Sequence, residues 1–182
     1  MQALWAVPVH ERRSCAVYLL QARGDLLGPS DLPFIQRIVR QSKSWAYVDV
    51  LAVNVIGELL VRSPQAADAL DAWAQDEDFW VRRSALLSQI APLKAGVGFL
   101  RFGRYADAML DETEFFIGKA IGWTLRETGK RRPEEVYEWL APRAGRASGV
   151  TMREAVKYLS PDQRRALLDA ARDMRRARLS PK

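Results

Sequence analysis

The sequence predicts an all-α fold built as a helical solenoid, a curved stack of antiparallel helix pairs. Apolar residues recur at helical spacing along almost the whole chain. The chain breakers between these segments are Gly28, Pro29, Pro64, Gly96, Pro133, Gly145 and Pro161. A pattern of small and apolar residues also returns about every 35 residues, which is typical of repeats with two helices per unit.

The predicted helices follow from these segments in chain order. They cover residues 9–24, 31–42, 44–62, 65–75, 77–92, 97–110, 113–129, 134–141, 151–159 and 162–177. Side-chain oxygens suited to N-caps stand at three of the starts, at Ser30, Ser44 and Thr151. Pro133 suits the first turn of its helix, where the missing N–H costs nothing.

The repeat becomes visible when alternate helices are aligned. At steps of 34 or 35 residues, one column holds Ala16, Leu51, Ala85, Ala120 and Ala155. The next column is apolar throughout, with Val17, Ala52, Leu86, Ile121 and Val156. Two positions before the first column stand Ser14, Asp49, Arg83, Gly118 and Arg153. Because equivalent positions of a solenoid line one surface, we expect Asp49 and Arg83 to be neighbours.

Composition bounds the domain organisation and the partner. A chain of 182 residues with 48% hydrophobic content can bury one sizeable core, so we predict a single domain over residues 1–182 with a basic tail from about residue 173. The net charge of +6 favours a polyanionic partner bound in a salt-dependent manner. The same charge also fits a surface that is merely solvated.

Few residues are of the types that hold metals or form disulfides. Cys15 is the single cysteine and lies in an apolar stretch, so we predict that it is buried, and His10 is the single histidine. With no cluster at ligand spacing, we expect metal-free chemistry and no cofactor. No signal peptide or membrane-spanning window is evident, so we expect a cytoplasmic monomer that does not act at a membrane.

Four side chains suggest a site for a phosphodiester and a cationic base. Trp45 precedes Asp49 by four residues, which places both on one helical face. Arg83 offers a planar fork suited to a phosphate. Trp123 offers a second aromatic face, but its spacing alone does not place it beside the others. We interpret the remaining tryptophans as packing residues: Trp5, Trp73, Trp80 and Trp139.

Three separated segments match one known family in order and at similar intervals. They are SWAYVD at 44–49, FWVRRSALLSQI at 79–90 and FFIGKAIGWTLRETGKRRPEEVYEWL at 115–140. From about Leu4 to Leu159 the chain resembles the AlkD-type alkylpurine DNA glycosylases, whose HEAT-like repeats agree with the predicted solenoid. The family has paired tryptophans and an additional aspartate where this chain has Ser44, Trp45 and Ala46, although Asp49 is retained.

The resemblance implies a DNA repair enzyme that acts on duplex DNA. The substrates would be purines alkylated at N3 or N7, whose positive charge makes them good leaving groups without protonation. Asp49 would stabilise the oxocarbenium-like transition state and orient the attacking water. Trp45 and Trp123 would pack against the sugar and backbone of the damaged nucleotide.

Further basic residues are candidate DNA contacts. Arg83 would hold a phosphate, and Arg82 would either flank it or have a structural role. Lys119 and Arg126 would hold the backbone or pair with Glu114 or Glu127. Three more arginines would extend a basic stripe: Arg12, Arg13 and Arg153. Two alternatives stay open, a DNA-binding relative without catalysis and a scaffold that binds another protein.

Overall fold

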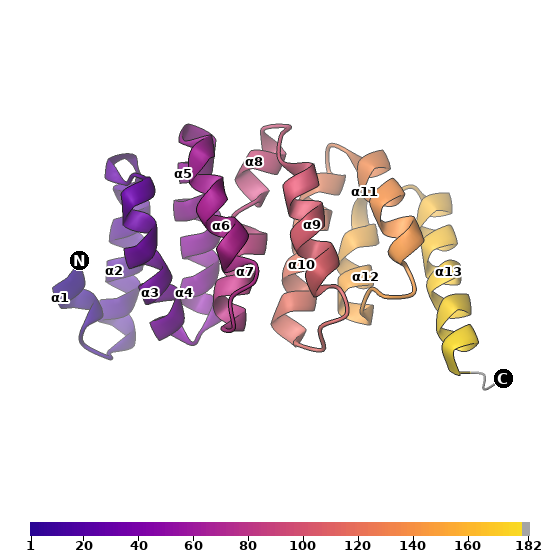
Figure 1. Ribbon diagram of the computed structural model, residues 1–182, viewed down its shortest axis with the longest axis horizontal. Helices are drawn as coiled ribbons and strands as arrows, with labels where there is room; N and C mark the ends of the chain where they lie inside the picture. Colours follow the sequence, from indigo (N-terminus) through magenta and orange to yellow (C-terminus); the bar gives the residue numbers. More distant parts are fainter. Residues whose placement is uncertain (180–182) are drawn as a thin grey trace. The chain divides into compact units, whose positions relative to one another are not determined.

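The computed structural model describes residues 1–179, and their regular structure is helical. The chain forms two compact units, Met1–Gly98 and Phe99–Lys182. Figure 1 shows the helices of each unit. The all-α prediction is confirmed, while the assignment of the whole chain to one domain stays a prediction.

The first unit consists of short helices arranged in two layers. In the view of Figure 1, α3 and α6 lie in front of α2 and α4. Its α-helices are α1 (Gln2–Trp5), α2 (His10–Ala22), α3 (Leu32–Ser42), α4 (Trp45–Val50), α5 (Gly57–Arg62), α6 (Ala67–Trp73), α7 (Phe79–Leu87) and α8 (Ile90–Lys94). Short 3-10 turns cover Gly24–Leu26, Pro29–Asp31 and Pro64–Ala66, and a π-helical segment covers Leu51–Ile56.

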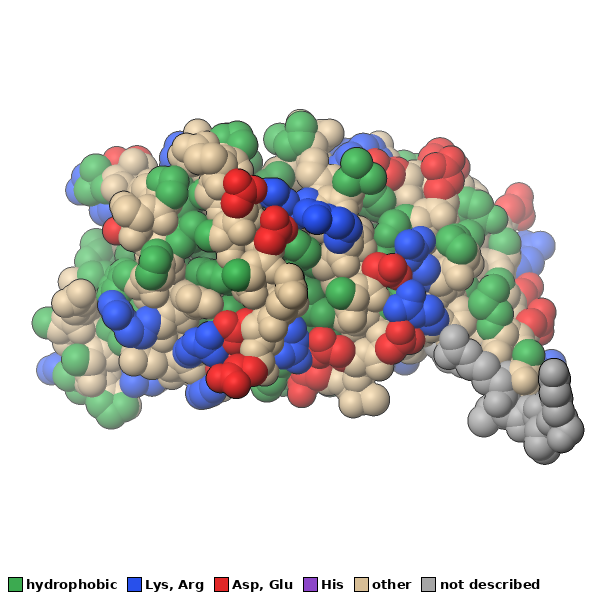
Figure 2. All heavy atoms as spheres, viewed as in Figure 1, with side chains coloured by type: hydrophobic (Ala, Val, Ile, Leu, Met, Phe, Trp, Pro, Cys, Tyr) green, Lys and Arg blue, Asp and Glu red, His purple; other side chains and the backbone are tan. Residues whose placement is uncertain are grey.

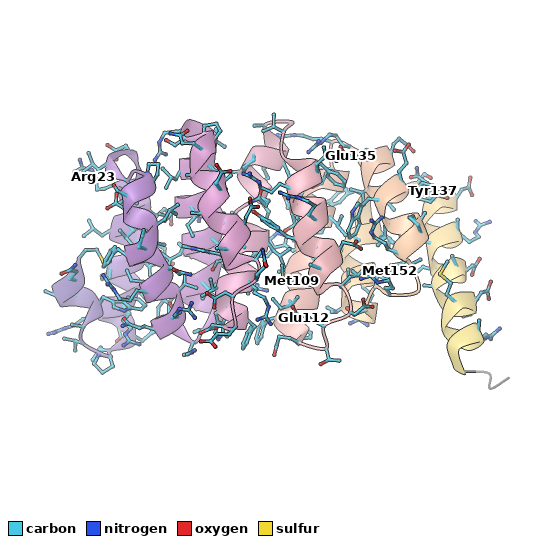
Figure 3. The ribbon with its side chains drawn as sticks, in the orientation of Figure 1. Arg23, Met109, Glu112, Glu135, Tyr137 and Met152 are labelled. Atoms are coloured by element: carbon cyan, nitrogen blue, oxygen red, sulfur yellow. The ribbon has the colours of Figure 1, made fainter. Side chains whose placement is uncertain are left out.

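The second unit repeats this layered arrangement, with α9 and α11 in front of α10 and α12 (Figure 1). Its α-helices are α9 (Phe99–Met109), α10 (Phe115–Gly129), α11 (Pro133–Leu140), α12 (Gly149–Ala155) and α13 (Pro161–Leu179), and 3-10 turns cover Ala141–Arg143 and Val156–Tyr158. Met109 and Met152, labelled in Figure 3, are buried. The predicted basic tail continues α13 as far as Leu179, and residues 180–182 lie outside the described residues.

The core confirms the repeat. All five residues of the first aligned column are 0% exposed, and the second column is buried at every position. Hydrogen bonds between helices join residues about one repeat apart, such as Trp5 with Gln41 and Arg143 with Asp107, both 36 residues apart. Within each unit, neighbouring helix pairs therefore pack against one another, as expected for a helical repeat.

Two of the predicted helices differ from the observed ones. The helix predicted over 44–62 is continuous, but its middle third is π-helical. The helix predicted over 77–92 is divided after Leu87. Pro92 has no N–H to donate to the carbonyl of Ser88. At the division itself, the N–H of Gln89 donates to the carbonyl of Leu86, and the side chains of Ser88 and Gln89 donate to the carbonyl of Ala85. The short helix α1 was not predicted.

The helix starts confirm two of the four predictions. Ser44 caps α4 by accepting from the N–H of Ala46, and Pro133 occupies the first turn of α11. Ser30 is not a cap, because it lies within a 3-10 turn and Asp31 precedes α3. Thr151 is not a cap either, because Ser148 caps α12.

The burial predictions for tryptophan and cysteine had mixed outcomes. Trp5, Trp73 and Trp80 are buried, and Trp139 is half-buried. The prediction for Cys15 is wrong, since this residue is exposed on α2 even though the neighbouring Ala16 is in the core. None of the described helices combines the length and the apolar character needed to cross a lipid bilayer.

Candidate DNA-repair site

The centre of the candidate site is an ion pair between α4 and α7. Arg83 Nε donates to Asp49 Oδ1, and Arg83 Nη2 donates to Asp49 Oδ2, both at 2.8 Å. This confirms that the two residues are neighbours although they are 34 positions apart. The contact is bidentate and charge-assisted, the strongest form of a protein hydrogen bond and the one that best fixes a carboxylate's orientation.

The two members of the pair differ in exposure. The Arg83 side chain is 3% exposed, whereas the Asp49 side chain is 16% exposed. A carboxylate has about four lone-pair sites, and Arg83 occupies two of them. Asp49 therefore keeps acceptor capacity on the side that solvent can reach.

Trp45 occupies the first position of the same short helix, α4. Its side chain is 57% exposed, in contrast to the buried Trp5, Trp73 and Trp80. Ser44 fixes the start of the helix by accepting from the N–H of Ala46 at 3.3 Å. A large aromatic side chain held in solvent at a rigid helix start is available to pack on a ligand.

The backbone immediately after Asp49 has an unusual geometry. The π-helical segment Leu51–Ile56 begins two residues after Asp49, and four of its six side chains are buried: Leu51, Ala52, Val55 and Ile56. Such widened turns are rare and occur frequently at functional sites. The apolar pattern of this segment resembles that of an ordinary α-helix, so the sequence alone does not indicate a π-helix.

The other basic residues of the first unit have different surroundings. Arg82 Nη1 donates to the carbonyls of Asp76 and Glu77 at 2.6 and 3.0 Å, which holds the segment that leads into α7. The Arg13 guanidinium lies 4.9 Å from the centre of the Trp5 ring. Arg12 is exposed. The two hydrogen bonds of Arg82 therefore support the structural role considered for this residue.

In the second unit, Lys119 and Arg126 contact a carboxylate that the sequence analysis did not identify. Lys119 Nζ donates to Glu154 Oε1 at 2.6 Å, and Arg126 Nη1 donates to Glu154 Oε2 at 2.5 Å. Lys157 Nζ donates to Oε2 at 2.9 Å. The expected alternative partner Glu114 instead caps α10, while Glu127 lies 3.6 Å from Arg126.

Glu154 remains ionised despite its burial. Its residue is 7% exposed, and this burial by itself would raise the carboxyl pKa. Hydrogen bonds from Lys119 and Lys157, together with the charges of Lys119 and Arg126, outweigh burial and lower the pKa of Glu154 to about 2. A signal in the sequence was available: Lys119 and Glu154 directly precede Ala120 and Ala155 of the aligned column.

Two glycines allow α12 to approach α10 closely. A Cβ atom on Gly118 would lie 2.8 Å from the hydroxyl of Ser148, and one on Gly122 would lie 2.8 Å from Cβ of Glu154. The Thr151 hydroxyl donates to the carbonyl of Gly118 at 3.0 Å. The absence of side chains at these two positions thus brings Glu154 within reach of the α10 cations.

The remaining candidates of the second unit lie near this contact. Trp123 follows Gly122 on α10 and is half-buried, and Arg153 on α12 is exposed. The face visible in Figure 2 carries lysine and arginine side chains interleaved with acidic ones. Within the described residues, no group of three or more His, Cys, Asp or Glu side chains is arranged to hold a metal ion.

The fold defines a helical-repeat protein, and comparison with known proteins identifies its family. The model of the DNA alkylation repair enzyme family matches residues 1–159. The chain therefore belongs to the DNA alkylation repair enzyme family. A similar solved structure is a predicted DNA alkylation repair enzyme from Enterococcus faecalis, with 25% sequence identity and a TM-score of 0.80 over 88% of this chain and 74% of that chain. No curated protein matches.

Proposed function

We propose that this protein is an AlkD-type DNA glycosylase that hydrolyses the N-glycosidic bond of cationic N3- or N7-alkylated purines in duplex DNA. Membership of a DNA alkylation repair family supports a role on damaged DNA. The observation that carries the proposal is Asp49, a carboxylate oriented by Arg83 yet still partly exposed. It lies on the helix that begins with the exposed Trp45.

The reaction needs stabilisation of positive charge on the sugar. When the bond between the sugar and the base breaks, the electron pair leaves with the alkylated purine and neutralises its charge. The sugar develops oxocarbenium character, which the carboxylate of Asp49 stabilises. Water, oriented by an acceptor oxygen of Asp49, then adds to the sugar carbon and gives up its proton to the surrounding solvent.

The buried Arg83 has a positioning role in this proposal. Its residue is 2% exposed, so a phosphate could reach it only after a rearrangement. The two hydrogen bonds instead hold both carboxylate oxygens of Asp49 in one orientation. We therefore assign Arg83 to the orientation of Asp49 in place of the direct phosphate contact expected from the sequence.

The aromatic and basic side chains would hold the damaged nucleotide and its strand. Trp45 offers an exposed face to a sugar or a cationic base, a contact worth about 0.5–2 kcal/mol, and the resemblance supports the same role for Trp123. The exposed Arg12 and Arg153 would contact phosphates without reading the base sequence. We propose that the protein acts in this way as a cytoplasmic monomer.

Base release from methylated duplex DNA tests the proposal. We expect the protein to release 7-methylguanine or 3-methyladenine and the Asp49→Asn variant to bind the same DNA with little release. Because Asp49→Asn leaves the buried Arg83 without a counter-charge, both proteins are assayed well below the melting temperature of the variant. Absence of release by a protein with native circular dichroism would refute the glycosylase assignment.

One observation favours a second function, a DNA-binding protein without catalysis. Both oxygens of Asp49 already accept hydrogen bonds from a cation, which partly neutralises the charge that would stabilise the sugar. This function predicts tight binding to alkylated DNA with no release by either the wild type or Asp49→Asn.

A further inference from the structure

We propose that Lys119, Arg126 and Lys157 form a binding site for a phosphate of the DNA backbone, and that Glu154 holds these cations in place. The site belongs to α10, α12 and the turn after α12, all within the second unit. The inference rests on the proposed function, because it takes duplex DNA as the partner. It adds Lys157 as a contact and Glu154 as a positioning residue.

The number of cations exceeds what the buried carboxylate needs. Among the described residues, Glu154 accepts hydrogen bonds from three cations although one would neutralise it. Glu127 adds a second carboxylate 3.6 Å from Arg126, and Lys130 donates to both oxygens of Glu127. Four cations thus face two carboxylates, which leaves the cluster with two positive charges available for an anion.

The cations are partly solvent-exposed, whereas the carboxylate is not. The Lys119, Arg126 and Lys157 side chains are 38%, 26% and 46% exposed, and the Glu154 side chain is 9% exposed. Each lysine ammonium carries three N–H donors and uses one on Glu154. Donors therefore remain for the oxygens of a phosphate approaching from the solvent side.

The anchoring also lowers the cost of binding. Ordering a lysine or arginine side chain costs conformational entropy, and here much of that ordering is present before a ligand arrives. The close approach at Gly118 and Gly122 makes it possible, since a side chain at Gly122 would displace Glu154. A preorganised group of charge-assisted donors is a general way to bind phosphate.

A second charged network in the same unit provides a contrast. Arg143 and Arg146 both contact Asp107, and Arg146 also contacts Asp111. Here two cations are matched by two carboxylates, which is what crosslinking adjacent repeats requires. These contacts of Arg143 and Arg146 thus lack the excess of positive charge that the contacts of Glu154 show.

The salt dependence of binding to undamaged duplex DNA tests the site. We expect Lys119→Gln and Lys157→Gln to weaken binding and each to reduce the slope of log affinity against log salt by about 1. Arg165→Gln is the matched control, because Arg165 on α13 is 74% exposed and the substitution removes the same charge outside the cluster. Its slope should equal that of the wild type.

Glu154→Gln separates positioning from simple charge. The substitution adds one positive charge to the protein, so electrostatics alone would strengthen DNA binding. If Glu154 holds the cations in place, binding by folded Glu154→Gln should weaken instead. Should this variant fail to fold, Lys119→Gln and Lys157→Gln still test the phosphate site. Each of them leaves two cations to neutralise Glu154.

The outcomes distinguish this site from the glycosylase activity. Equal slopes for the wild type and both lysine variants would overturn the site, as would an equal loss in Arg165→Gln. Base release is measured on the same wild-type preparation. Normal release with unchanged slopes would refute the phosphate site alone. Cluster-specific slopes without release would refute the glycosylase activity alone.

Discussion

Each unit has a carboxylate close to the aligned column, and the two units use it in different ways. In the first unit, Asp49 pairs with the single guanidinium of Arg83 and remains partly exposed. In the second unit, Glu154 is nearly buried and contacts three cations. The Asp49–Arg83 contact joins residues 34 positions apart, and the Lys119–Glu154 contact joins residues 35 positions apart. Contacts between neighbouring repeats thus hold both the carboxylate that we propose to be reactive and the one that we propose to anchor cations.

The environment explains why the roles would differ. A carboxylate that stabilises a developing cation must be accessible and keep acceptor capacity, and the partly exposed Asp49 meets this requirement. A carboxylate surrounded by cations has its charge more than compensated and stabilises the fold. The comparison therefore predicts that changes at Asp49 slow base release in addition to destabilising the buried Arg83, and that changes at Glu154 act on stability and on DNA affinity with little effect on base release.

The largest expected effect is on the rate of base release in Asp49→Asn. Two unit charges about 4 Å apart interact by about 4 kcal/mol at the effective dielectric of a protein surface, which corresponds to about a thousandfold in rate. Single-turnover release of 7-methylguanine measures this loss. Glu154→Gln serves as the control. A loss of the same size in that variant under saturating enzyme would show that the two carboxylates do not differ in their effect on base release.

Glu154→Gln should act mainly on the free energy of unfolding and only weakly on the rate of base release. Removing the carboxylate leaves three cations close together without their counter-charge, and breaking a buried ion pair costs about 3–5 kcal/mol. Urea unfolding followed by circular dichroism measures the free energy of unfolding. A change below about 1 kcal/mol would show that the cations relax into solvent and that Glu154 does not anchor them.

Acid should weaken the second unit through Glu154. Its folded pKa of about 2 lies below the ordinary value of 4.5, so the ionised form stabilises the folded state by about 3 kcal/mol at neutral pH. This contribution is complete above pH of about 5 and is lost as the pH falls toward 2. Urea unfolding between pH 2 and 6 should show this decline in the wild type, and a decline of equal size in Glu154→Gln would contradict it.

The sequence predicted the repeat and the contact between Asp49 and Arg83 better than it predicted the contacts of Glu154. The buried column from Ala16 to Ala155 follows from apolar periodicity, and the repeat register alone predicted that Asp49 and Arg83 are neighbours. The contacts of Glu154 depend on how closely α12 approaches α10, which Gly118 and Gly122 determine. This approach distance is a tertiary property, so local pairing with Glu114 or Glu127 looked equally suitable for Lys119 and Arg126.

Gly122→Ala tests that approach directly. The added Cβ would lie 2.8 Å from Cβ of Glu154 and 2.9 Å from the carbonyl of Thr151, so the helices must separate at a cost of about 1–3 kcal/mol. Gly149→Ala is the matched control in the same unit, because the nearest atom to its added Cβ is 4.0 Å away. We expect the melting temperature to fall in Gly122→Ala and to stay near the wild-type value in Gly149→Ala.

Trp45→Ala should have the smallest effect on stability and still affect the chemistry. Since 57% of Trp45 is exposed, its removal should change the free energy of unfolding by about 0.5 kcal/mol or less. Loss of its face against a sugar or cationic base should slow base release by about 2- to 30-fold, the equivalent of a contact worth 0.5–2 kcal/mol. The buried Trp73 provides the opposite case, because Trp73→Ala should destabilise the first unit by about 3–5 kcal/mol. Equal stability losses in the two variants would mean that Trp45 is a packing residue, and the proposed site around Asp49 would then lose its aromatic contact with the nucleotide.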